Sequence, residues 1–169
     1  SIVMKFILMI FLLFIGINII YSQKYAKNQF VVFSYKVDID ERVKKELNPY
    51  SDKIKYDLNK KHSKVEGMLV HSIYSIITKT LSDSLDIYFL TPNCFGDKIK
   101  YNDFGYPEIV IQKAIRLMDA KYFMKIDASI ENSKFDEKGK KISEGLFLPV
   151  VNISIEIYNK FWFDPIQTG

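Results

Sequence analysis

Apolar and polar residues alternate in three stretches of the chain, and this period of two predicts a β-strand in each. The stretches are Phe30–Val37, Tyr122–Glu131 and Val151–Tyr158. The regular alternation of the last two indicates strands with one face packed against the core and the other in water. In the first stretch, the side chains expected to share one face are Val31, Phe33, Tyr35 and Val37.

Two other stretches have the three- and four-residue spacing of apolar positions that is typical of an amphipathic helix. One is Ser63–Leu81, and the other begins at Pro107 and ends near Ala120. Proline suits the first position of a helix because its missing N–H has no partner there, and Glu108 would lie favourably at the positive end.

Two shorter elements complete the pattern. A charged helix is expected to begin at Asp38 or Asp40 and to end at Asn48–Pro49. The unbroken apolar run Ile87–Leu90 is typical of a central strand or of a strand in a parallel sheet. The order is then β-α-β-α-β-β, with crossovers between the first three strands and a hairpin at the end. We therefore expect an α/β two-layer sandwich with a mixed sheet of about four to five strands and helices mainly on one face.

The C-terminal region adds a loop and a turn. The charged segment Asn132–Glu144 is expected to be the long loop of the final hairpin. Asp164–Gly169 is typical of a turn, and a turn normally leads into another element. The sequence thus predicts one α/β domain over residues 23–169, truncated at its C-terminal side.

The start of the chain has the three parts of a secretory signal peptide. Lys5 is a lone cation, Phe6–Ile20 is apolar, and Ser22 is a small residue before the expected cleavage site. Met4 is the natural initiator, which makes residues 1–3 an upstream extension. The alternative is a membrane-tethered domain with an uncleaved first helix, although a spanning helix needs about twenty apolar residues.

The charge and the cysteine content indicate in which compartment the protein is expected to act and which partners are expected. The net charge of +4 falls to +3 when the signal, whose only charge is Lys5, is removed, and so balanced a domain does not favour nucleic acid as a partner. A single cysteine cannot form an internal disulfide, so the exported domain depends on packing alone. This fits the periplasm or outer envelope of a Gram-negative bacterium, and the composition resembles that of Bacteroidota envelope proteins; secretion from the cell stays open.

No set of residues for catalysis, for metal binding or for holding a cofactor is apparent. The histidines, His62 and His71, have no cysteine near them in the sequence, and Asp38–Glu41 fits helix capping better than a cation loop. Cys94 follows the Ile87–Leu90 run, at the carboxyl end of a strand where α/β sheets often place sites. It is the candidate reactive thiol, and an exported hydrolase that uses Cys94 or unpaired carboxylates is the alternative to a binding protein.

The loop that follows offers the candidate binding residues. Tyr101, Phe104 and Tyr106 provide aromatic contact area beside the strand ends. The competing interpretation is that Phe104 and one tyrosine close the edge of the core.

Two segments carry a resemblance to known proteins. Ile111–Asp127 passes from a helix through an acidic-aromatic link into an alternating strand, and Ile155–Tyr158 is followed by Asp164 and Thr168–Gly169. This pattern resembles envelope α/β domains of the TolB amino-terminal and curli-secretion lipoprotein type, although the lipoprotein cysteine is missing. The resemblance implies an assembly or interaction module without catalysis and transfers no site residues. We therefore expect an exported, non-enzymatic module whose wet sheet face or aromatic loop contacts a protein or another envelope component.

The signal interpretation predicts that the mature protein begins at Gln23. Edman sequencing or intact mass of the protein purified from cells should show the loss of every residue up to Ser22. A protein that keeps Met4 and the apolar run would instead support the tethered alternative.

Overall fold

The computed structural model describes residues 29–53, 63–133, 141 and 147–168. They contain a five-stranded mixed sheet in the order β2-β1-β3-β4-β5. The long strands are β1 (Gln29–Ile39), β3 (Tyr122–Asn132) and β4 (Pro149–Asn159), and the short strands β2 (Tyr88–Phe89) and β5 (Trp162–Thr168) lie at the two edges. β1 is parallel to β2 and β3, whereas β4 is antiparallel to both β3 and β5. The predicted α/β class, mixed sheet and final hairpin are confirmed.

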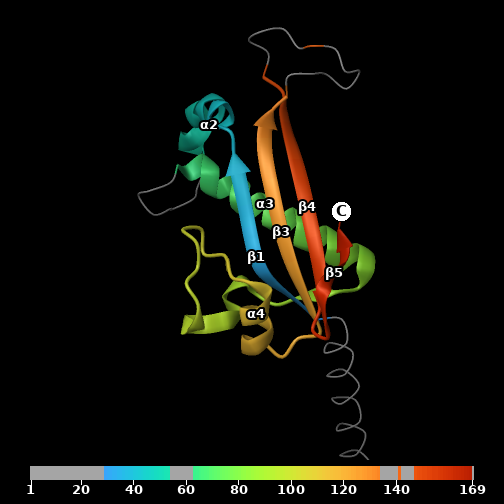
Figure 1. Ribbon diagram of the computed structural model, residues 1–169. Coiled ribbons are helices and arrows are strands. Elements are labelled where there is room, and N and C mark those ends of the chain that lie inside the picture. Colours follow the sequence, from blue (N-terminus) through green and yellow to red (C-terminus); the bar gives the residue numbers. More distant parts are fainter. Residues whose placement is uncertain (1–28, 54–62, 134–140, 142–146, 169) are drawn as a thin grey trace, which may run out of the picture.

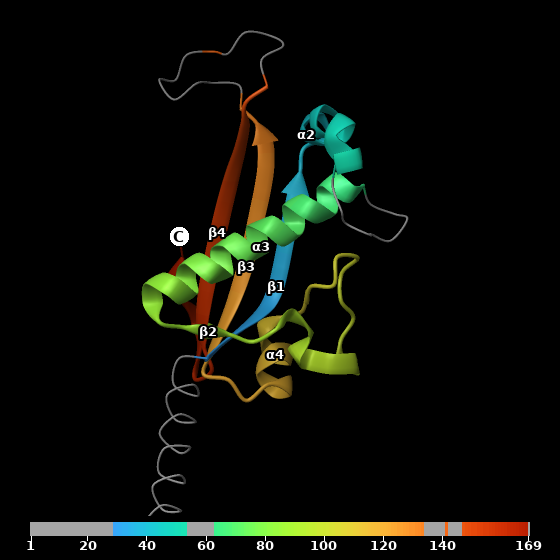
Figure 2. The same ribbon diagram turned by 180° about the vertical axis from the view of Figure 1, so that it is seen from behind.

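Helices pack on the sheet from both sides, but the longest contact is on one side. α3 (Lys64–Leu85) crosses one face obliquely, and α2 (Glu41–Leu47) adds to the same core at the top of β1 (Figures 1 and 2). α4 (Ile111–Leu117) and the 3₁₀ helix Pro92–Lys98 cover the lower part of the other face. The first core includes Val32, Tyr35, Val70, Ile73, Met124 and Ile126; the second includes Val31, Phe33, Phe95, Ala114 and Phe123.

α3 is fixed at its start and in its middle by hydrogen bonds. Ser63 and Glu66 form a capping box, in which the Glu66 N–H donates to Ser63 Oγ at 3.2 Å and the Ser63 N–H donates to Glu66 Oε2 at 2.8 Å. On the sheet, the buried Tyr35 hydroxyl donates to the carbonyl oxygen of Val70 at 2.6 Å. This bond ties α3 to β1 from within the first core. The predicted Ser63–Leu81 helix is therefore confirmed and extends to Leu85.

A β-bulge in β1 overturns the predicted facing of its side chains. Val32 lies opposite Met124 and Ser34 lies opposite Lys125, so one residue, Phe33, is extra in the β1 strand. Val31 and Phe33 consequently belong to the second core, while Tyr35 belongs to the first. The expectation that Val31, Phe33, Tyr35 and Val37 share one face was wrong because it assumed an unbroken period of two.

The start of α4 also differs from the prediction. Pro107 and Glu108 form isolated bridges to Tyr101 and Ser34, and the helix begins only at Ile111. The reason is tertiary: the carbonyl oxygen of Pro107 accepts the N–H of Tyr35 at 3.0 Å, so this segment pairs with β1 beside the bulge.

Both short strands differ from what the sequence pattern predicted. The Ile87–Leu90 run contributes an edge strand of two residues with Tyr88 48% exposed, so its assignment as a central strand was wrong. The segment predicted as a terminal turn, Asp164–Gly169, lies largely within β5. Its Pro165 lies opposite Tyr158 on an edge strand, where proline is tolerated because one side has no ladder partner.

β3 shows the predicted alternation with one exception. Its even-numbered residues face the first core, whereas Lys125 and Asp127 lie on the polar face. Phe123, expected on the wet side, is completely buried because α4 and the 3₁₀ helix cover that end of the sheet.

The expected signal and most of the hairpin loop lie outside the described residues. Within the described part of the chain, no helix is long and apolar enough to cross a membrane.

The second core provides a test of the packing. Phe123→Ala should lower the free energy of unfolding by about 3–5 kcal/mol, because Phe123 is fully buried and its removal leaves a cavity. Phe161→Ala is the matched control: with 76% of its surface exposed, Phe161 should contribute no more than about 0.5 kcal/mol. Urea unfolding measures the loss of unfolding free energy in each variant, and equal losses would contradict the assigned core.

Candidate functional site

Tyr106, one of the three predicted binding residues, is part of the core. Its ring is 5% exposed and packs against Tyr35 and Tyr74, with ring centroids 4.7 and 4.6 Å apart respectively. Its hydroxyl lies 2.7 Å from His71 Nδ1, and burial lowers the pKa of that histidine. Tyr106 therefore attaches the loop to α3 and leaves little surface for a partner.

Tyr101 and Phe104 are half-buried on opposite sides of the same loop. Tyr101 packs against the second core and Phe104 against the first. Asn102 organises the turn between them: its Oδ1 accepts the N–H groups of Phe104 and Tyr106 at 3.1 and 3.0 Å, and its Nδ2 donates to the carbonyl oxygen of Tyr35 at 3.2 Å. The structure thus places all three predicted binding residues against the cores, as in the packing alternative, and leaves Tyr101 and Phe104 partly accessible.

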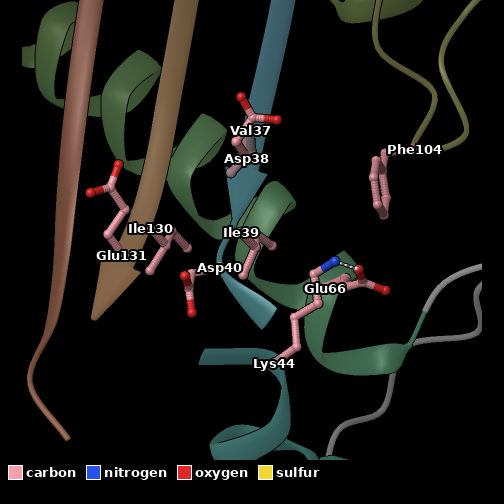
Figure 3. Close-up of a pocket in the computed structure, with 9 residues that line it drawn as sticks. All are labelled: Val37, Asp38, Ile39, Asp40, Lys44, Glu66, Phe104, Ile130 and Glu131. Atoms are coloured by element: carbon pink, nitrogen blue, oxygen red, sulfur yellow. Dashed lines mark ion pairs between the residues drawn. The ribbon is translucent and has the colours of Figure 1, made fainter. Parts of the chain in front are cut away.

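Phe104 also borders a hollow of about 400 Å³ at the top of β1 (Figure 3). Charged side chains line it, but the helix starts use several of them. Asp40 Oδ1 accepts the N–H of Arg42 at 2.8 Å and caps α2, as the sequence predicted. Lys44 pairs with Glu66 at 3.0 Å, and Glu66 belongs to the α3 capping box. The charged side chains in these contacts therefore serve to hold the starts of α2 and α3.

The polar face of the sheet carries a network of ion pairs. Lys125 lies 2.7 Å from Asp127 and 3.1 Å from Glu156, and these two carboxylates raise its pKa. The Tyr158 hydroxyl donates to Glu156 and, together with Lys125, lowers the pKa of that carboxyl. The alternation predicted this wet face. Its charges are largely paired with one another, which is typical of a solvated surface.

Cys94 lies at the border of the second core and is half-buried. Burial raises the pKa of its thiol, the opposite of what activates a cysteine nucleophile. Among the described residues no hydrogen bond joins its sulfur to a histidine or carboxylate, and His71 is engaged with Tyr106. The described part of the chain likewise contains no group of three or more His, Cys, Asp or Glu residues arranged to hold a metal ion.

The outer edge of β4 is the feature that sequence reasoning missed. β5 pairs with β4 only from Glu156 to Asn159, so within the described chain residues 149–155 have no strand on that side. Both faces of this stretch are exposed from Pro149 to Ser154, and burial begins only at Ile155. In Figure 1 the upper part of β4 accordingly lacks an outer neighbour. The exposed apolar side chains are Val150 (38%), Val151 (48%) and Ile153 (42%).

The hydrogen bonds at the ends of β4 show which backbone groups face outward. The Ser133 N–H donates to the carbonyl oxygen of Leu148 at 2.8 Å, and the Lys160 N–H donates to that of Lys121 at 2.9 Å. Because the backbone groups of an antiparallel strand alternate between its two sides, the even-numbered residues of β4 bond to β3. The outward groups of the free stretch therefore belong to Pro149, Val151, Ile153 and Ile155.

The opposite edge of the sheet is paired as far as Tyr35. Beyond β2, the outer side of β1 is paired with the segment around Pro107, through Tyr35 N–H to the Pro107 carbonyl at 3.0 Å and Ile109 N–H to the Phe33 carbonyl at 3.1 Å. Asn102 bonds to the carbonyl of Tyr35 on the same side. Among the described residues, the part of β1 beyond Tyr35 and the upper part of β4 therefore have no strand on their outer sides.

A sequence signal for this edge exists. Residues 149–155 read Pro-Val-Val-Asn-Ile-Ser-Ile, a run rich in β-branched residues and without a charge. Natural edge strands usually carry lysines or other charges that prevent unwanted pairing. The run alone could not show that both faces of this stretch are exposed.

The environment of Cys94 predicts slow thiol chemistry. Because burial raises the pKa of the thiol, iodoacetamide should alkylate Cys94 in the native protein at neutral pH several-fold more slowly than in the urea-unfolded chain. Mass spectrometry over a time course measures both rates. Native alkylation faster than in the unfolded chain would indicate an activated thiol and favour the hydrolase alternative.

Comparisons with protein-family models, with curated proteins and with solved structures found no match to this chain. They therefore neither support nor oppose the resemblance to TolB-type envelope domains.

Proposed function

We propose that this chain is an exported, non-enzymatic binding module that contacts a protein partner through the exposed, uncharged surface of β4. The single observation that carries the proposal is the stretch 149–154 of β4, which is exposed, carries no charge and presents Val150, Val151 and Ile153 to solvent. Export rests on the signal-like residues up to Ser22, and the expected compartment is the periplasm or outer envelope.

The apolar side chains of this stretch lie on both faces of β4. Val151 and Ile153 lie on the face that α3 packs against, and Val150 lies on the opposite face. Exposed apolar side chains that lie next to one another mark contacts with other proteins, whereas scattered single ones do not. The partner that fits is therefore a protein surface with apolar side chains.

The surrounding surface supports a protein ligand. The stretch 149–155 is uncharged, Glu131 lies opposite Val150 on the polar face, and further along that face Lys125 pairs with Asp127 and Glu156. Such a surface has no row of cations for a phosphate backbone. An assembly or interaction role is also what the resemblance to TolB-type envelope domains implies.

A photo-crosslinking residue in place of Asn152 tests the proposal in cells that produce the protein. Because Asn152 lies exposed on the free stretch, we expect crosslinked adducts from this position. Adding Val150→Lys should abolish most of them, since it places a charge among the exposed apolar side chains, while Glu131 lies opposite on β3 and can pair with it. Lys79, on an exposed part of α3 with 75% of its side chain accessible, is the control position. Equal adducts from both positions, or adducts that survive Val150→Lys, would contradict a contact through β4.

A further inference from the structure

We propose that the upper outer edge of β1, residues 36–40, binds an extended segment of another protein in which a lysine or arginine stands between two apolar residues. This site is separate from the exposed stretch of β4 and does not depend on the function proposed above. The ligand would lie beside Val37 and Ile39 and continue the row of main-chain bonds that the segment around Pro107 makes with the strand.

The chain leaves this edge open by turning away from it. The segment around Pro107 runs antiparallel to β1 and accepts the N–H of Tyr35, so its continuation in the same line would lie beside Val37. Instead the backbone turns at Gly105, where φ is +83°, and the Gly105 N–H donates to the carbonyl oxygen of Asn102 at 2.9 Å. The pairing of this edge therefore stops at Tyr35 because of a turn within the described chain.

Two residues of the edge present unused backbone groups. The Asp40 N–H donates inward to the Ile130 carbonyl of β3 at 2.9 Å, whereas the backbone of Tyr35 bonds outward. Since alternate residues of a strand bond to opposite sides, Val37 and Ile39 direct their N–H and C=O groups outward. Among the described residues no hydrogen bond uses these four groups, so an added strand can make up to four main-chain bonds here.

The hollow of about 400 Å³ lies along this edge and is acidic. Four consecutive residues, 37–40, line it, and Phe104 lies on its far side from β1 (Figure 3). Its charged groups are four carboxylates and one ammonium, because only Lys44 offsets Asp38, Asp40, Glu66 and Glu131. An excess of carboxylates beside a row of free backbone groups favours a cationic peptide as the ligand.

The alternation of β1 determines where the cation of the ligand should stand. Val37 and Ile39 are partly buried against the first core, while Asp38 is exposed on the polar face. Lys36, the nearest cation on that face of β1, is 2.8 Å from Glu108, and no ion pair within the described residues involves Asp38. Because side chains on the same face of neighbouring strands interact, the ligand residue beside Asp38 should be lysine or arginine and the two flanking it apolar.

A short peptide with this pattern tests the site. The probe is acetyl-Thr-Val-Lys-Val-Thr-amide, added to the isotope-labelled full protein and followed by NMR. We expect shifts of the Val37 and Ile39 amide signals, and slower hydrogen exchange of both amides by several-fold, since each N–H gains an acceptor. The same peptide with glutamate in place of lysine should bind several-fold more weakly, because its charge meets Asp38.

Reversing one charge on the protein should reverse the preference. In Asp38→Lys the glutamate peptide should bind better than the lysine peptide, because the pair at this position is restored with the opposite signs. Asp83→Lys is the matched control: it makes the same charge change on an exposed side chain of α3, outside the residues that line the hollow, and should leave the preference for lysine unchanged. The dispersion of the amide spectra verifies that both variants are folded.

Three results would overturn the inference. They are equal binding of the two peptides to the native protein, a preference for lysine that survives Asp38→Lys, and no binding of either peptide. Shifts confined to residues 149–154 would also overturn it, although they would agree with a contact through β4. The crosslinks from position 152 test that contact separately, so either proposal can fail without the other.

Discussion

One extra residue in β1 determines how the rest of the molecule is arranged. The bulge at Phe33 lets the lower part of the strand contribute Val31 and Phe33 to one core, and lets Tyr35 enter the other. Below the bulge the sheet needs cover on both faces, which α3 and the α4 region provide. Above it one face turns polar. The Pro107 segment pairs with β1 at this same point, so the bulge also fixes the loop that carries Asn102.

The sequence predicted the fold best where a periodic pattern runs without interruption. The faces of β3 were correct from Met124 onward because the ladder of β3 with β4 has no irregularity. The prediction failed where tertiary contacts override local preference. Phe33 is extra only in relation to β3, and Pro107 begins no helix because Tyr35 takes its carbonyl. Phe123 is buried only because segments distant in the sequence cover it. None of these contacts produces a pattern in the local sequence from which it could be predicted.

The candidate site was harder to foresee than the fold. Aromatic residues in a loop are ambiguous, since the same rings serve binding and packing, and Tyr106 is buried by Tyr35 and Tyr74. The exposed stretch of β4 was missed for a different reason. Its alternation predicted one covered face, whereas α3 crosses the sheet obliquely and leaves Val151 and Ile153 exposed on that face (Figure 2).

The pairing of the Pro107 segment with β1 makes a loop part of the sheet. The Tyr35 N–H donates to the Pro107 carbonyl and the Ile109 N–H donates to the Phe33 carbonyl, which are bonds of the kind that a neighbouring strand would make. A segment held in this way opens together with the sheet, whereas an ordinary surface loop opens on its own at much lower cost in free energy. The chain between the 3₁₀ helix and α4 therefore belongs to the cooperative unit of the core.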